Sequence, residues 1–191
     1  MERSTTTVRR TPNQESRRQE IIAAAASVVA AEGLAACTVR RIAEVTPLTK
    51  STIHYYFDDA DELIDLVVIE VIRLFADLCT TILAEAGRKK SIVILTRIFI
   101  GREWGMYSNA SLLWHEFAVH SLQRDRHEGL VQTFALVSDV FESSVGDSSR
   151  ALHNYLLGLN FRIRATDPDF AEIASDVSTL TGVEITAADL A

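Results

Sequence analysis

The feature that most restricts the fold is a long stretch, residues 59–86, that carries apolar side chains at helical spacing. Two neighbouring apolar stripes run along it: Leu63, Val67, Val71, Leu74, Leu78 and Ile82 in the first, and Ile64, Val68, Ile72, Phe75, Cys79 and Leu83 in the second. A surface helix needs only one such stripe, so a helix with two must be covered on more than one side. We therefore expect a central helix, opened by a capping box of Asp59 and Glu62 and closed by Gly87 and the basic residues 88–90.

The rest of the chain also favours helices. Its 191 residues include only 8 Gly and 3 Pro, too few turn residues for a many-stranded β fold, and 48% are hydrophobic, too many for a disordered chain. The residue patterns predict an all-α fold in which further helices cover residues 17–32, 38–45, 49–56, 91–107, 111–121, 124–145, 148–164 and 168–180.

Cys37 and Cys79 lie in apolar stretches without the spacing of a metal site or a CxxC motif. This favours two buried thiols in a reducing compartment. The longest apolar run is far shorter than the ~20 residues that a bilayer span needs, and no signal peptide is recognised. We expect a cytoplasmic protein that has no cofactor, metal or membrane partner.

The net charge of −7 is unevenly distributed. Residues 1–57 contain eight Lys or Arg and five Asp or Glu, a net charge of +3, whereas residues 58–191 carry a net charge of −10. A basic head on an acidic body indicates that the first third of the chain meets a polyanion. Within it, residues 1–15 are expected to form a mobile basic arm whose arginines are either solubilising or minor-groove ligands.

Two short helices follow the first one in this head. Thr38 and Thr49 are suitable N-caps, and Pro47 between the two helices prevents them from fusing. A supporting helix, a capped helix, a tight turn and a second capped helix are the layout of a helix-turn-helix DNA reader.

The residues strengthen this interpretation. Characteristic elements occur in order: Glu32-Gly33, Thr38-Val39-Arg40-Arg41-Ile42-Ala43, Thr49-Lys50-Ser51-Thr52-Ile53-His54-Tyr55-Tyr56-Phe57 and Glu62-Leu63. The run over residues 16–68 resembles the N-terminal domain of the tetracycline-repressor (TetR) family of transcriptional regulators. The resemblance implies a helix-turn-helix domain at 16–58, a larger helical effector-binding and dimerisation domain at 59–191, and a homodimer. It also implies a repressor that binds a palindromic double-stranded DNA operator and is released by an apolar or amphipathic small molecule.

Three positions depart from the family pattern. Pro47 stands where Gly is usual in the turn, His54 where a Tyr commonly contacts phosphate, and Ala60 where a Lys opens the long helix. The nearby acids Asp58, Asp59 and Asp61 could also repel DNA, so the arm arginines would have to compensate.

The helix from Thr49 should turn Ile53 and Phe57 inward and place its polar side chains in the major groove. Arg40 matches a family position that often reads a base, although it could be only a solvated surface arginine. His54 and Tyr55 could instead pack on the first helix. The predicted DNA-binding residues are Thr38, Arg40, Thr49, Lys50, Ser51, Thr52, His54 and Tyr55.

Large, polarizable side chains gather in the predicted helices of the body, as an effector cavity or a packed core would require. With the family resemblance, the predicted effector residues are Phe75, Cys79, Phe99, Trp104, Tyr107, Trp114, His115 and Phe117. The last two long helices resemble the family's dimer-forming pair, or else pack only within the chain. Their predicted interface residues are Ala151, Tyr155, Gly158, Ala171 and Ala174.

Two other classes of function compete with the regulator interpretation. An enzyme lacks support because the chain has no nucleotide-binding or GxSxG motif, and His115-Glu116 is followed by Val119 where a zinc-protease HExxH motif requires His. A helical protein-interaction module would leave the basic head and its motif order unexplained. DNA-affinity measurements distinguish this module from a regulator.

Overall fold

A computed structural model describes residues 11–57, 59–101 and 108–191, with the side chains of 108–111 and 164 outside the description. This part of the chain is all helical and contains no strand, so the predicted fold class is confirmed. The helices are α1 (Pro12–Glu32), α2 (Val39–Val45), α3 (Lys50–Tyr56), α4 (Ala60–Leu83), α5 (Arg88–Phe99), α6 (Ser108–Gln123), α7 (His127–Val145), α8 (Ser149–Ala165), α9 (Phe170–Thr181) and α10 (Ala187–Leu190).

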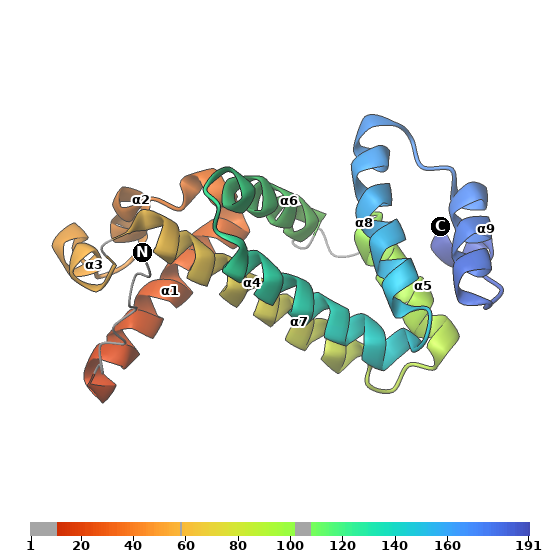
Figure 1. Cartoon of the computed structure of the whole chain (residues 1–191), viewed down its shortest axis with the longest axis horizontal. Coiled ribbons are helices and arrows are strands. Elements are labelled where there is room, and N and C mark those ends of the chain that lie inside the picture. The colour runs from red at the N-terminus through yellow and green to blue at the C-terminus, as the bar shows by residue number, and fades with distance from the viewer. Residues whose placement is uncertain (1–10, 58, 102–107) are drawn as a thin grey trace, which may run out of the picture.

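The helices form an elongated arrangement (Figure 1). At one end, α1, α2 and α3 make up the head, and α1 packs on the first part of α4. Helix α4 then runs beside α7 toward the other end of the molecule, where α5, α8, α9 and α10 lie together. The prediction of a long helix covered on more than one side is confirmed, since α4 packs against α1, α6 and α7.

Helix α1 begins earlier than residue 17. Thr11 and Gln14 form a reciprocal capping box. The backbone N–H of Gln14 donates to Thr11 Oγ1 at 3.4 Å, and the backbone N–H of Thr11 donates to Gln14 Oε1 at 2.9 Å. Pro12 occupies the first helical position, where its fixed φ and missing N–H are tolerated. The predicted helix start at residue 17 was wrong, and residues 12–15 are helical rather than part of an arm. Residues 1–10, with Arg3, Arg9 and Arg10, lie outside the described residues.

The boundary between α4 and α5 also differs from the prediction. The basic residues 88–90 do not close α4 but open α5. Arg88 is held there by tertiary contacts, because its guanidinium donates to the carbonyl oxygens of Val145 at 2.8 Å and Thr181 at 2.9 Å. These are the last residues of α7 and α9, and a cation at a helix C-terminus is favoured by the helix dipole.

The two reading-head helices follow the prediction closely. Thr38 caps α2 by accepting from the Arg41 amide, and Thr49 caps α3 by accepting from the Thr52 amide. Pro47 lies between them in an extended turn. Their buried residues, Ile42 and Ile53, join the hydrophobic core that continues into the body.

Candidate DNA interface and regulatory core

Helix α3 has a buried apolar side and an exposed polar side. Ile53 is completely buried and Phe57, just after the helix, is nearly so. Lys50, Ser51 and His54 are exposed. Tyr55 has 70% of its surface exposed, which excludes packing of its ring under α1. Because a helix can enter the major groove of DNA, this exposed side is available for reading base edges.

Hydroxyl groups mark the start of α3. The Thr49 and Thr52 Oγ1 atoms lie 2.8 Å apart, and Thr49 Oγ1 accepts the Thr52 amide at 3.1 Å. Thr38 plays the same capping role at α2, with the Arg41 amide 3.1 Å from its Oγ1 atom. All three predicted threonines therefore shape the reading helices directly, whatever they contact on DNA.

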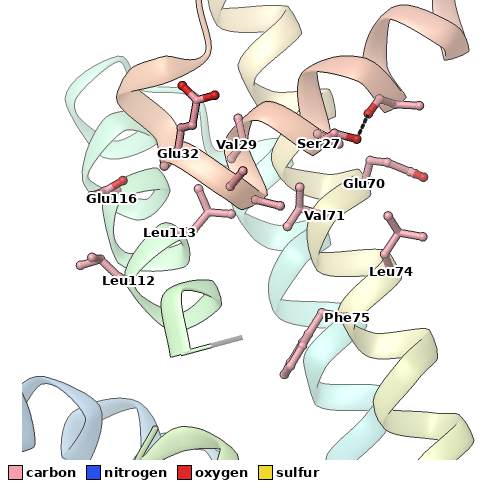
Figure 2. Close-up of a pocket in the computed structure, with 15 residues that line it drawn as sticks. Ser27, Val29, Glu32, Glu70, Val71, Leu74, Phe75, Leu112, Leu113 and Glu116 are labelled. Carbon is pink, nitrogen blue, oxygen red and sulfur yellow. Dashed lines mark hydrogen bonds between the residues drawn. The ribbon is translucent and has the colours of Figure 1, made fainter. Parts of the chain in front are cut away.

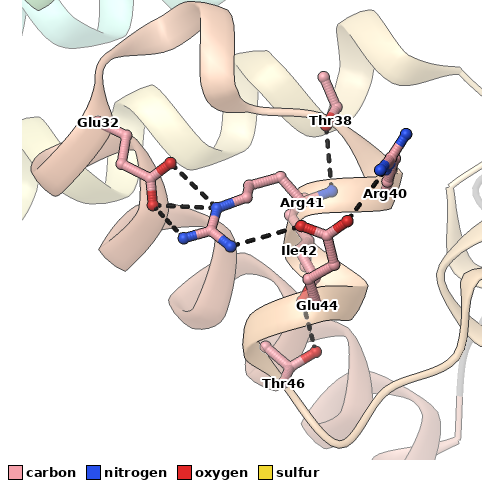
Figure 3. A network of polar contacts seen from close by, with 7 residues as sticks. All are labelled: Glu32, Thr38, Arg40, Arg41, Ile42, Glu44 and Thr46. Carbon is pink, nitrogen blue, oxygen red and sulfur yellow. Dashed lines mark hydrogen bonds and ion pairs between the residues drawn. The ribbon is translucent and has the colours of Figure 1, made fainter.

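Adjacent arginines on α2 have different surroundings (Figure 3). The Arg40 side chain is 79% exposed, and its Nε atom donates to Glu44 of the same helix at 3.0 Å. The Arg41 guanidinium instead reaches α1, where it donates to both carboxylate oxygens of Glu32. This contact lowers the pKa of Glu32 and fixes α2 to the end of α1. Arg40 is the arginine left facing outward.

Arg18 is a structural cation that the sequence analysis did not single out. It is buried, forms an ion pair with Glu62 of α4, and lies over the Phe57 ring with its Cζ atom 4.7 Å from the centroid. It thereby joins α1, the end of α3 and α4. Arg18 lies one helical turn before the buried Ile21 and Ile22 of α1, so the sequence spacing could have predicted that its side chain lies on the buried face of this helix.

Acidic residues at the start of α4 are paired with cations of the body. Arg126, between α6 and α7, donates to Asp59 at 3.1 Å and to Asp65 at 2.7 Å. Arg124 lies 3.0 Å from Asp61, and His120 lies 3.2 Å from the same carboxylate. Asp59 and Asp61 are thus paired within the chain and are not isolated negative charges. Asp58 lies outside the described residues.

The sequence of this region matches a known family. Residues 21–67 match the profile of the bacterial regulatory proteins of the tetR family. Residues 21–67 are thus a DNA-binding domain of the TetR type. The match runs from the middle of α1 into α4 and includes every predicted DNA-binding residue. The protein is therefore a DNA-binding transcriptional regulator. Comparison with curated proteins gives no match.

The body of this regulator contains a cluster of aromatic rings, most of which are buried. His153 of α8 is only 4% exposed and lies between Trp114, at a centroid distance of 5.8 Å, and Phe141, at 4.6 Å. Phe99 and Phe134 complete the cluster at 6.2 and 6.4 Å from His153. We refer to these five residues as the aromatic cluster. It brings together two predicted effector residues, Phe99 and Trp114.

The aromatic cluster contains few polar groups. Trp114 Nε1 donates to Thr133 Oγ1 at 2.9 Å, and His153 Nδ1 lies 3.5 Å from Ser138 Oγ. His153 Nε2 has no hydrogen-bond partner within the described part of the chain. Burial lowers the pKa of His153 to about 4, so its ring is neutral at pH 7. His153 could not be predicted as part of this cluster, because a lone histidine in a helix carries no signal of its surroundings.

The other predicted effector residues do not share this place. Phe117 is completely buried where α4, α6 and α7 meet. It packs so closely on Gly129 that a Cβ atom added to this glycine would lie 3.2 Å from the Phe117 Cζ atom. Cys79 is buried in α4, where burial raises its pKa to about 12. The His115 ring faces Phe161 at 3.8 Å, and Phe75 lines a separate cavity described below. Trp104 and Tyr107 lie outside the described residues.

Helices α8 and α9 pack on each other within one chain. Tyr155 Oη donates to Asp176 at 2.8 Å, so this predicted interface residue has an internal partner. Ala174 is buried and packs in the core of the same chain. Ala151 and Ala171 are exposed, and nothing lies within 4 Å of a Cβ atom placed on Gly158.

The described residues show neither a membrane-spanning helix nor a cluster of metal-binding side chains. None of the helices there combines the length and apolar character needed to cross a membrane. No group of three or more potential metal-binding side chains is found in the same part of the chain.

Proposed function

We propose that this regulator is a ligand-responsive repressor that binds a palindromic operator as a homodimer. The observation that carries the proposal is the outward side of α3 and α2, where polar and basic side chains are exposed over a buried apolar back. In this proposal the head ends near residue 58, and the body from residue 59 onward binds the effector and forms the dimer.

On DNA, α3 lies in the major groove. Lys50, Ser51, His54 and Tyr55 meet bases or phosphates, while the Thr38, Thr49 and Thr52 hydroxyls donate to phosphates. Arg40 reads a base from α2, because its exposed guanidinium can exchange the contact with Glu44 for a bidentate contact with guanine.

Dimerisation supplies the symmetry of the operator. The exposed side of α8 and α9, with Ala151, Gly158 and Ala171, provides small side chains that allow close approach of a second copy. A twofold axis then presents two heads to two half-sites about one helical turn, ~34 Å, apart.

The effector enters the body beside the aromatic cluster. Trp114 and His153 offer large ring surfaces, and His153 Nε2 is a buried polar atom that could orient a ligand. The Arg126 and Arg124 ion pairs connect the α6–α7 turn to the start of α4, directly after the head. An effector that favours another position of this turn changes the placement of the head and lowers operator affinity by its differential binding energy, ~1–3 kcal/mol.

Selection of bound sequences from randomised double-stranded DNA tests this proposal. The expected result is enrichment of inverted repeats by the full chain. Enrichment of a single unrepeated site would contradict the homodimer, and no enrichment would contradict sequence-specific reading by α3.

A further inference from the structure

A second region of the molecule has the properties of a binding site. A cavity of about 610 Å³ lies where α1, α4 and α6 meet, between the head and the body (Figure 2). Small organic ligands occupy cavities of about 300–1,000 Å³. None of the five residues of the aromatic cluster lines this space, so we name it the junction cavity and treat it as a separate site.

The junction cavity exists because one of its walls is made of small residues. Helix α1 contributes Ala23, Ala26 and Ala30, whose short side chains leave the space unfilled. The facing walls carry Leu74 of α4 and Leu112 of α6, which are 52% and 39% exposed. Exposed leucines gain stability when an apolar molecule covers them, at about 25 cal/mol per Å² of buried apolar surface.

Carboxylates surround this apolar space. Glu32, Glu70 and Glu116 come from α1, α4 and α6, one from each helix, and no Lys or Arg is among the described lining residues (Figure 2). Arg41 and Arg73 hold the pKa of Glu32 and Glu70 below their usual range, so both are ionised at neutral pH. Glu116 forms no ion pair within the described part of the chain, and its exposed carboxyl group is accessible to a ligand.

We propose that the junction cavity binds an apolar organic cation, with its hydrocarbon surface against Leu74 and Leu112 and its charge beside Glu116. Glu116, the carboxylate of this lining that has no ion-pair partner among the described residues, disfavours an anion of the same shape because like charges repel. The bound cation would brace α1 against α4 and α6 and so favour one placement of the head. This effect on operator affinity rests on the proposed function, whereas binding to the cavity does not.

Calorimetric titration of the full chain without DNA tests the site. Tetraphenylphosphonium and tetraphenylborate have closely similar shapes and opposite charges, and the cation should bind while the anion binds at least tenfold more weakly. The Glu116→Gln variant should weaken cation binding about fivefold, the scale of one partly exposed ion pair. Glu142→Gln on α7 removes an exposed carboxylate that does not line the cavity and should leave the affinity unchanged.

A filling variant locates the bound cation. Ala30→Phe adds a ring to an exposed position that lines the cavity and should abolish binding while the circular dichroism spectrum stays that of the wild type. Equal affinity for both probes, or wild-type cation affinity in both the Glu116→Gln and Ala30→Phe variants, would overturn the assignment. If the cation binds as expected but leaves operator affinity unchanged, the junction cavity is still a cation-binding site. The result would contradict only the claim that its occupant regulates operator binding.

Discussion

In the head, polar side chains of α3 point to solvent and apolar ones to the core, whereas in the body Phe99, Trp114 and Phe117, which were predicted to meet a ligand, are themselves buried. Lys50, His54 and Tyr55 are free to contact a macromolecule. Trp114 and His153 are covered by other helices of the same chain. A DNA-reading surface can thus be recognised in one chain without its ligand, while an effector site inside a core must be distinguished from packing by experiment.

The two regions also use cations differently. Arg40 of the head is exposed, but Arg18 is buried against Glu62 and Phe57. Arg126 of the body holds two carboxylates at the start of α4. Of these three arginines, Arg18 and Arg126 join helices to each other, and Arg40 stays exposed.

The largest expected effect on stability tests whether Phe117 belongs to the core of the body or to a ligand site. Phe117→Ala should lower the free energy of unfolding by about 3–5 kcal/mol, because Phe117 is fully buried and its removal leaves a cavity. Urea denaturation measures the loss. A variant of nearly wild-type stability that loses affinity for an effector would instead make Phe117 a ligand contact.

A second effect tests the aromatic cluster. The pKa of His153 is about 4 in the folded protein against an ordinary 6.5, so between pH 6.5 and 4 the unfolded chain binds a proton that the folded chain does not. The free energy of unfolding should therefore decrease by about 3 kcal/mol as the pH is lowered from 6.5 to 4, because of this one group.

His153→Phe keeps a ring between Trp114 and Phe141 and removes the titrating group. The stability difference between wild type and variant, measured by urea denaturation from pH 7 to pH 4, should shift by this amount in favour of the variant. Parallel pH profiles for the two proteins would mean that His153 is not held neutral by burial.

The two preceding predictions concern Phe117 and His153, whose surroundings could not be predicted from the sequence. The boundaries of α2 and α3 were predictable because Thr38, Thr49 and Pro47 act within a few residues of themselves. The start of α5 was not, since Arg88 is held by carbonyl groups 57 and 93 residues away. His153 is another such case, because its neighbours come from three other helices.

The candidate site shows the same division. The inward side chains of α3 followed from helix geometry and are confirmed by the burial of Ile53 and Phe57. The predicted effector residues were grouped only by their chemistry, and the structure distributes Phe75, Phe99 and Phe117 over three different places.

A third prediction compares two adjacent arginines of the head. Arg40→Ala should weaken operator binding by about 1–3 kcal/mol, with unequal effects on different bases, and should leave stability unchanged. Arg41→Ala is the matched control, since it should slightly lower stability through loss of the Glu32 contact and leave base preference unchanged. Fluorescence anisotropy with base-substituted operators distinguishes them. Reversed roles for the two arginines would refute the assignment made from their exposure.

The smallest effect concerns nonspecific attraction. Lys50→Ala should weaken binding to all sequences alike and reduce the slope of log affinity against log salt by about one, as expected for a single phosphate contact. Anisotropy titrations over a range of salt concentrations give this slope. A sequence-dependent loss with an unchanged slope would make Lys50 a base-reading residue.

Methylation interference tests the central claim, that the exposed side of α3 reads bases in the major groove. Methylation of guanine N7 modifies the major-groove edge, so bound and unbound fractions of a methylated operator reveal where that edge is required. We expect interference at symmetry-related guanines in two half-sites, centred about one helical turn apart. Binding that is indifferent to N7 methylation throughout a guanine-containing operator would contradict the claim.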